Sequence, residues 1–175
     1  NPKCGQTLPI VSTHIRCEKC GYLLDVSYKE KPPTKLKDVF YQRRSRDSIY
    51  NESGVWRFRE LLNFTEIETD DLEQCSKFLV SLDGAEGRQS KPYHMSKVSN
   101  FVGINNNSLM LQPEGYNPSG SFKDNGMATA VTHAKMTGAK KIICASTGNT
   151  SASAGMFAAN ENMECDVYIP DGQIA

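Results

Sequence analysis

The 175-residue chain carries 20 basic and 20 acidic residues, which gives a formal net charge of +0. A dedicated nucleic-acid-binding protein normally has a basic excess or a basic stripe, so this balance argues against that class. No apolar run reaches the roughly 18 residues that a membrane-spanning helix needs, and no membrane span is expected. The chain does not begin with Met and stops directly after a strand-like segment, which favours a piece of a longer protein.

Residues 1–28 are punctuated by cysteines and lack helical periodicity. Cys17-Glu18-Lys19-Cys20-Gly21 is a CxxC-Gly knuckle, and Cys4-Gly5 is typical of the second half of another, with Asn1 where its partner cysteine would stand. A structural zinc site needs four ligands, so Cys4, Cys17 and Cys20 leave one place open. Two interpretations follow: a zinc site completed by another group such as His14, or a degenerate ribbon without metal.

Residues 29–75 are polar and charged, with Pro32-Pro33 near their start, and they are typical of a linker or an arm laid over a surface. Within them, residues 54–62 hold the only tryptophan, Trp56, and predict a short anchoring helix.

Residues 76–175 form the third predicted segment, and from Leu109 onward they alternate between strand and helix patterns. Their fold class is α/β. Because short turns join the elements, we expect parallel βαβ units with right-handed crossovers. Cys144 and Cys165 fall in apolar strand patterns, which predicts buried free thiols in a reducing compartment. The expected strands cover residues 108–112, 140–145 (a buried-type strand) and 165–170, and the expected helices cover 122–137 and 151–160.

Lys123 follows a turn of small residues and opens the first of these helices. A lysine is normally protonated up to a pKa of about 10.4 and is then no nucleophile. Burial at the mouth of a cleft lowers that pKa, and a carbonyl cofactor can then trap the amine as a Schiff base. The alternative is a solvated lysine in a helix N-terminal turn, which the helix dipole mildly disfavours.

A second turn, residues 146–151, joins a predicted strand to a predicted helix around Gly148. Exposed backbone amides at such a junction favour a carboxylate or a phosphate, and Asn149 adds a side-chain donor. The alternative is an ordinary turn capped by Thr150 or Ser151. Gly148 is not part of a GxGxxG pattern, so a dinucleotide-binding fold is not indicated.

Together, NPSGSFKDNGM (117–127) and CASTGNTSAS (144–153) strongly resemble the threonine synthase family of fold-type-II pyridoxal phosphate enzymes. LLDV (23–26) resembles that family's N-terminal ribbon, GVWRFRELL (54–62) its arm, and IPDGQIA (169–175) the strand after the asparagine turn. The resemblance implies the N-terminal portion of such an enzyme: a small cysteine ribbon followed by a truncated parallel-sheet domain like that of the tryptophan synthase β subunit.

The resemblance also implies roles for individual residues. Lys123 would form the Schiff base with pyridoxal 5'-phosphate and later move protons at the substrate's carbon atoms. Asn149 would bind the phenolic oxygen of the cofactor, and Phe122 would lie by its ring. The substrate carboxylate would be held by Ser146, Thr147 and Thr150. Zinc, where the ribbon holds it, would be bound by Cys4, Cys17 and Cys20.

The implied reaction is that of a carbon–oxygen lyase: O-phospho-L-homoserine and water give L-threonine and phosphate, with the cofactor as electron sink. The expected partner is this small-molecule substrate, with a homodimer among the expected assemblies and no nucleic acid or membrane. The expected location is the cytoplasm, or a plastid in a photosynthetic eukaryote. Two alternatives stay open: another fold-type-II enzyme, such as a serine/threonine dehydratase or a sulfhydrylase, and a non-catalytic zinc-ribbon interaction module.

The sequence departs from the family's pattern in three places. Residues 84–92 replace its usual glycine-asparagine-threonine-proline stretch, and Gln112 stands near the place of a usual lysine. The chain also ends before the glycine-rich loop that would bind the cofactor phosphate, so this piece alone is expected to be inactive.

Overall fold

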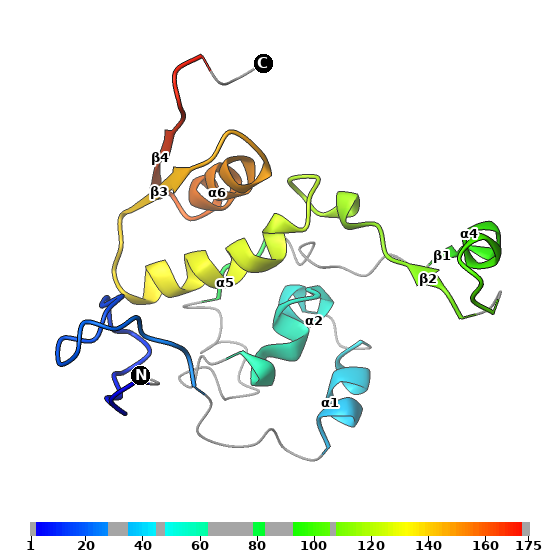
Figure 1. Cartoon of the computed structure of the whole chain (residues 1–175), viewed down its shortest axis with the longest axis horizontal. Coiled ribbons are helices and arrows are strands. Elements are labelled where there is room, and N and C mark those ends of the chain that lie inside the picture. Colours follow the sequence, from blue (N-terminus) through cyan, green and yellow to red (C-terminus); the bar gives the residue numbers. More distant parts are fainter. Residues whose placement is uncertain are drawn as a thin grey trace.

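The structure, a computed structural model, describes residues 3–27, 35–44, 48–62, 79–82, 93–105 and 108–172. Three parts follow one another in the chain: a cysteine-bearing N-terminal segment, a helical arm, and an α/β unit that ends in a two-stranded parallel sheet (Figure 1). Residues 63–78 and 83–92 lie outside the described residues, and with them Cys75 and the departure from the family pattern at 84–92.

The N-terminal segment contains a tight turn built around the cysteine knuckle. Arg16 and Leu23 form an antiparallel bridge, and between them the amide of Gly21 donates to the carbonyl oxygen of Cys17 at 2.8 Å. Gly21 has a φ of 70°, which a glycine adopts without steric cost. This turn brings the two ends of the knuckle together without any helix.

The arm, predicted as a linker or as an arm laid over a surface, is helical in its described parts. It comprises α1 (Leu36–Arg43), α2 (Ile49–Glu52) and η1 (Trp56–Leu61), a 3-10 helix that confirms the anchoring helix expected around the tryptophan. Trp56 is completely buried, and its indole N–H donates to the carbonyl oxygen of Val80 at 2.8 Å. Burial of Tyr50 and Trp56 gives this polar stretch an apolar side that packs against the α/β unit.

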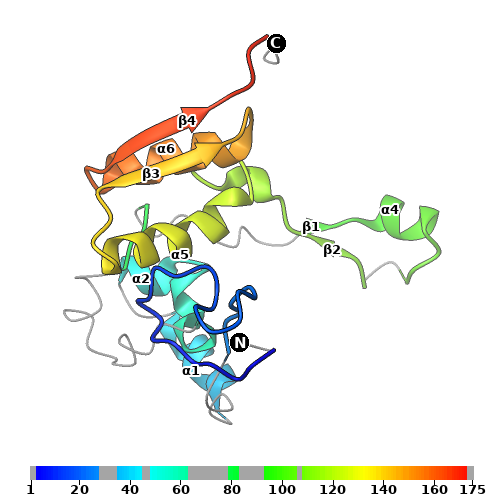
Figure 2. The same cartoon turned by 60° about the vertical axis from the view of Figure 1, so that its left-hand side comes forward.

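A narrow extension projects from the rest of the molecule in both views (Figures 1 and 2). It consists of β1 (Tyr93–His94), α4 (Ser96–Phe101) and β2 (Met110–Leu111), with the two strands antiparallel and Tyr93 opposite Leu111. The prediction that residues 108–112 begin the parallel sheet is therefore wrong. The strand pairs with residues 93–94 instead, and its side chains are exposed on both faces, unlike those of a parallel core strand.

The α/β unit follows η3 (Glu114–Tyr116) and consists of α5 (Lys123–Met136), β3 (Lys141–Ala145), α6 (Asn149–Asn160) and β4 (Glu164–Tyr168). β3 and β4 are parallel, with Lys141 opposite Glu164 and Ala145 opposite Tyr168. These four elements confirm the predicted helix–strand–helix–strand order. α6 contacts both strands and α5, and α5 lies beyond it (Figure 2).

β3 is not the buried strand that its apolar run predicted. Its side chains alternate between exposed and half-buried, and Ile143 is 65% exposed. Cys144 and Cys165 are free thiols, as expected, but both are half-buried rather than buried. The physical reason is that α6 packs on this two-stranded sheet while, among the described residues, nothing covers its other side.

One hydrophobic core joins the arm to the α/β unit. Thr132 on α5 accepts a 2.9 Å hydrogen bond from the amide of Val80, and the arm tryptophan binds the carbonyl of that same residue. The shared core therefore holds the middle of α5 against the arm. None of the described helices has the length and apolarity to cross a membrane. The core side chains are Tyr50, Trp56, Leu79, Val80, Ala128, Val131 and Phe157.

Candidate functional site

Lys123 is the first residue of α5, as the sequence predicted, and its side chain is half-buried. The side-chain amine lies 4.8 Å from the centroid of the Phe122 ring, a cation–π contact. Within the described part of the chain, no carboxylate oxygen lies within 4.0 Å of this amine. The amine is thus held beside an aromatic ring and is not neutralised by an acidic neighbour.

The loop before Lys123 is tightly folded and hydrogen-bonded. Gly120 has a φ of 80°, and its amide donates to the carbonyl oxygen of Asn117 at 2.7 Å. The carboxylate of Glu114 accepts from the side-chain amides of Asn117 at 2.8 Å and of Asn125 at 3.1 Å. These contacts join the start of the loop to the first turn of α5, so the lysine emerges from a fixed turn.

Asp124 is the residue of this site that sequence reasoning did not single out. Its side chain is fully buried and accepts hydrogen bonds from the Ser119 amide at 2.8 Å and the Ser119 hydroxyl at 2.5 Å. It also accepts from the hydroxyl of Ser153 on α6 at 2.6 Å. No local pattern pairs residues 124 and 153, and the only available signal is an acidic residue directly after a lysine in a small-residue loop.

The turn that contains Asn149 leads directly into α6. Asn149 is the first residue of this helix and Gly148 is its N-cap, without a side-chain cap hydrogen bond. The alternative in which Thr150 or Ser151 caps the helix is therefore wrong: the Ser151 hydroxyl donates backward to the carbonyl oxygen of Gly148 at 2.7 Å. An uncapped N-terminus leaves amides directed at solvent, which favours an anion there.

The other residues predicted for this turn are accessible. The Ser146 hydroxyl accepts from the amide of Gly148 at 3.2 Å, which shapes the turn. Thr147 and Asn149 are exposed, and Thr150 is half-buried. The bond between Asp124 and Ser153 joins the first turn of α5 to the second turn of α6. Consequently the lysine turn and the asparagine turn lie at the same end of the two packed helices.

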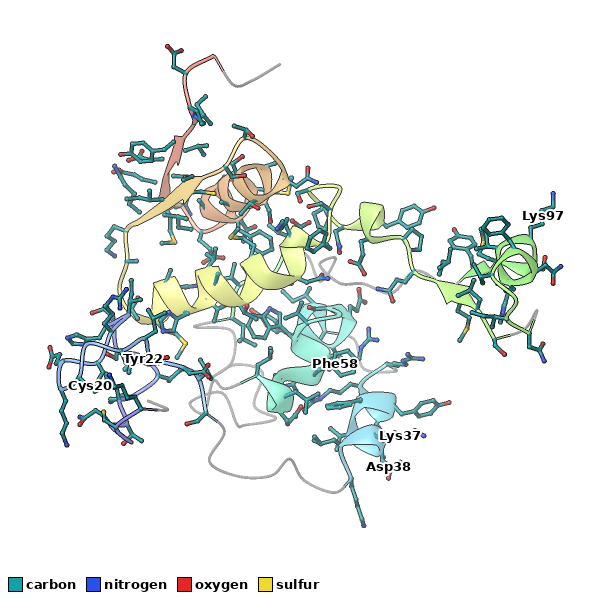
Figure 3. All side chains as sticks on the ribbon, viewed as in Figure 1. Cys20, Tyr22, Lys37, Asp38, Phe58 and Lys97 are labelled. Atoms are coloured by element: carbon teal, nitrogen blue, oxygen red, sulfur yellow. The ribbon has the colours of Figure 1, made fainter. Side chains whose placement is uncertain are left out.

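The three N-terminal cysteines also come together. The Sγ atoms of Cys4, Cys17 and Cys20 all lie within 4.8 Å of one another, and none of the three is in a disulfide (Figure 3 labels Cys20). His14 is not part of this group, since its Nδ1 lies 2.9 Å from the Ser12 hydroxyl and its Nε2 lies 2.8 Å from Glu18. The sequence interpretation that used His14 as a fourth ligand is not supported by this arrangement.

The pKa of Cys17 is lowered to about 7. Burial of the thiol opposes its ionisation, but hydrogen bonds from the backbone amides of Cys20 and Lys19, and from the other two thiols, outweigh that effect. A thiolate is the form of cysteine that binds metal ions, so the turn of the knuckle favours the ligand form of this side chain.

Part of the chain matches a known family model. Residues 89–174 match the family model described as pyridoxal-phosphate dependent enzyme, and this stretch includes Lys123 and the Asn149 turn. Over 173 residues, 99% of the chain, the sequence is 34% identical to threonine synthase of Methanocaldococcus jannaschii, of which it spans 38%.

Two bacterial relatives match the chain more closely over shorter stretches. The chain is 61% identical over 78 residues, 45% of its length, to threonine synthase of Bacillus sp. (strain ULM1), of which it covers 21%. It is 55% identical over 67 residues, 38% of its length, to threonine synthase of Synechocystis sp., of which it covers 18%. The chain thus resembles threonine synthase while spanning well under half the length of these relatives.

Proposed function

We propose that this chain is the N-terminal portion of a threonine synthase, a pyridoxal phosphate enzyme of fold type II that converts O-phospho-L-homoserine and water to L-threonine and phosphate. The resemblance to the threonine synthase of Methanocaldococcus jannaschii over 99% of the chain supports this proposal. So does the order of α5, β3, α6 and β4, which gives the parallel βαβ unit expected of the domain.

One observation carries the proposal: the lysine turn and the asparagine turn, far apart in the sequence, are joined at the same end of α5 and α6. The residues present suit pyridoxal phosphate. The amine of Lys123 has no carboxylate neighbour among the described residues and lies beside an aromatic ring, which suits covalent attachment to a planar aldehyde. When bound, the cofactor would supply the electron sink for carbanion chemistry at the substrate.

Each residue then has a proposed task. Lys123 holds the cofactor and afterwards moves protons at the substrate's carbon atoms. Asn149 donates to the phenolic oxygen of the cofactor, and Phe122 lies beside its ring. The uncapped amides of α6 favour the negative charge of the substrate carboxylate. That carboxylate is also bound by the hydroxyls of Ser146, Thr147 and Thr150.

The larger organisation is part of the same proposal. The cofactor domain begins near residue 76, and its β3–β4 pair belongs to a larger parallel sheet like that of the tryptophan synthase β subunit. Residues 1–28 form the ribbon and 29–75 the arm. The enzyme works in the cytoplasm, or in a plastid in a photosynthetic eukaryote, and assembles as a homodimer.

The decisive test uses the full-length protein that contains this sequence. We expect phosphate release from O-phosphohomoserine, together with the visible absorbance of a lysine-bound cofactor. Lys123→Ala abolishes both, whereas Lys140→Ala, which changes an exposed lysine of the same domain, leaves both intact. Cofactor absorbance that persists unchanged in Lys123→Ala rejects the lysine assignment. Deamination of serine or threonine as the main activity assigns the protein to the dehydratases instead.

We propose in addition that Cys4, Cys17 and Cys20 bind a zinc ion, and that the fourth ligand is a group other than these three cysteines. Tetrahedral coordination at a zinc–sulfur distance of about 2.3 Å separates two sulfur ligands by about 3.8 Å. The Sγ atoms of Cys4 and Cys17 are 3.6 Å apart, which suits that spacing. The CxxC knuckle, with Gly21 in the left-handed conformation, supplies the turn that such a site needs.

Metal analysis of the purified full-length protein tests the zinc proposal. We expect one zinc per chain, lost in Cys17→Ser and retained in Cys144→Ser, which changes a cysteine of β3 outside the cluster. Protein that holds no zinc, even after purification with zinc present, contradicts the site. Zinc without bound pyridoxal phosphate or phosphate release would favour the non-catalytic module.

A further inference from the structure

The buried carboxylate of Asp124 joins two segments of the proposed active site. It immediately follows Lys123, and both it and Ser153 are 0% exposed. Its oxygens accept three hydrogen bonds: two from Ser119 in the loop before the lysine, at 2.8 and 2.5 Å, and one from Ser153 on α6, at 2.6 Å. The donors of all three bonds lie outside the first turn of α5, to which Asp124 belongs.

Burying a carboxylate is costly unless its oxygens are well hydrogen-bonded. Among the described residues, no lysine, arginine or histidine nitrogen lies within 4.0 Å of Asp124. The three hydrogen-bond donors therefore take the place of water around the carboxylate, and no cationic side chain among the described residues pairs with it. The cost of taking a charge out of water offsets much of what its hydrogen bonds contribute, so stability alone is a weak reason for placing an acid here.

An acidic residue in the first turn of a helix is favoured by the helix dipole, but that effect does not account for these contacts. A residue that serves only its own helix end would bind amides of α5. Asp124 instead binds backward across five residues to Ser119 and across 29 residues to Ser153. Ser153 lies one helical turn after Asn149, so the link ends directly beneath the asparagine turn.

We propose that Asp124 is a positioning residue that fixes the lysine turn relative to the asparagine turn. This inference rests on the proposed function, because it assigns to Lys123 and Asn149 two adjacent groups of one cofactor, the aldehyde and the phenolic oxygen. Asp124 itself does not touch the cofactor. It holds the loop of residues 117–122 through Ser119 and holds α6 through Ser153, so that the attachment point and the ring-binding amide keep a constant separation.

The test uses the full-length protein and the variants Asp124→Ala and Ser153→Ala. The second variant removes only the link between the helices and keeps the bonds to Ser119. It therefore provides a test even where Asp124→Ala fails to fold. Three quantities are measured: the affinity of the cofactor-free protein for pyridoxal phosphate, the circular dichroism of the bound cofactor's visible band, and kcat. The matched control is Thr132→Val, which removes a buried hydrogen bond to Val80 eight residues further along α5.

Because a misplacement of about 1 Å costs roughly 100-fold in rate, we expect kcat to fall roughly 10- to 100-fold in both variants. The cofactor's circular dichroism changes in both, and its affinity falls. Thr132→Val lowers the unfolding temperature without changing the circular dichroism. Asp124→Asn restores most of the wild-type signal, since the serine hydroxyls can reorient to accept from the new amide group.

Two results would overturn the inference. In the first, Asp124→Ala and Ser153→Ala behave like Thr132→Val, with lower stability but unchanged cofactor dichroism and kcat. In the second, the wild-type protein binds no pyridoxal phosphate, and the proposed function then fails as well. The first result, obtained beside a wild-type protein that binds the cofactor normally, rejects the positioning role alone.

Discussion

The imidazole of His133 lies 2.7 Å from the carbonyl oxygen of Ile10, a contact across 123 residues. Since a carbonyl oxygen only accepts, Nε2 of the ring carries the hydrogen. This bond ties the N-terminal cysteine segment to α5, ten residues beyond the lysine at the start of that helix. The segment is therefore docked on the helix that carries the proposed cofactor attachment point.

Removal of this bond should loosen the N-terminal segment. In His133→Ala we expect residues 3–27 to be cleaved faster by a protease, while the free energy of unfolding falls by only about 0.5–1.5 kcal/mol. His133→Gln keeps a side-chain donor and serves as the control. Equal cleavage rates in wild type and His133→Ala would show that the bond does not hold the segment.

Replacing the buried tryptophan of the arm should destabilise the whole described core. Trp56→Phe removes the indole donor and leaves the carbonyl oxygen of Val80 without that partner, at a cost of roughly 1–3 kcal/mol. Urea denaturation of the full-length protein measures this loss. Tyr41→Phe, an exposed aromatic change on α1, is the control and should leave the unfolding midpoint unchanged.

The pairing of Glu60 with Arg43 should make stability depend on pH. Burial raises the pKa of Glu60, but hydrogen bonds and the positive charge of Arg43 outweigh it, so that the pKa lies below its ordinary value of 4.5. The folded state thus favours the ionised form, and the pairing stabilises the protein fully above about pH 4.5. That contribution is lost as the pH falls through the lowered pKa.

The variant Glu60→Gln isolates this effect. At pH 7 we expect it to be less stable than wild type, because Arg43 is 2% exposed and loses its anionic partner. The difference should shrink as the pH is lowered below 4.5. Denaturation curves of both proteins at a series of pH values provide the measurement, and a difference that is constant from pH 7 to pH 3 would contradict the assignment.

Two glycines of the lysine region should respond in opposite ways to alanine. Gly120 has a φ of 80°, where an added Cβ costs about 1–2 kcal/mol although no atom lies within 4 Å of it. Gly126 lies within α5 with open space around its Cβ position, so Gly126→Ala should stabilise by roughly 0.5–1 kcal/mol. Thermal unfolding separates the two. A Gly120→Ala variant as stable as wild type would mean that the loop adopts another conformation.

The sequence predicts the α/β unit well because its signals are local. The helical spacing of Met127, Ala130, Val131 and Ala134 and the apolar runs of β3 and β4 depend only on neighbouring residues. Each element appears within a few residues of its predicted position. The sequence predicts the start of α6 two residues late, because Asn149 and Thr150 are turn-forming residues that the helix nevertheless includes.

The missed features depend on contacts between distant residues. Strand β2 pairs with Tyr93 and His94, and nothing in its own composition indicates an antiparallel partner. For the site, the lysine and asparagine turns could be found from their small residues, but the Asp124–Ser153 link could not, since neither residue has an unusual neighbourhood in the sequence. The cysteine cluster is predictable only in part. Its CxxC knuckle is a local pattern, whereas the approach of Cys4 to that knuckle is a contact between distant residues.

The two-stranded parallel sheet has a consequence for the behaviour of the chain in solution. Within the described residues, β3 and β4 each pair on one side only, and their outer edges carry unpaired backbone donors and acceptors. Ile143 and Tyr168 are exposed beside those edges. Open, apolar strand edges are templates for further pairing. The 175-residue chain on its own is therefore prone to edge-to-edge association and to aggregation.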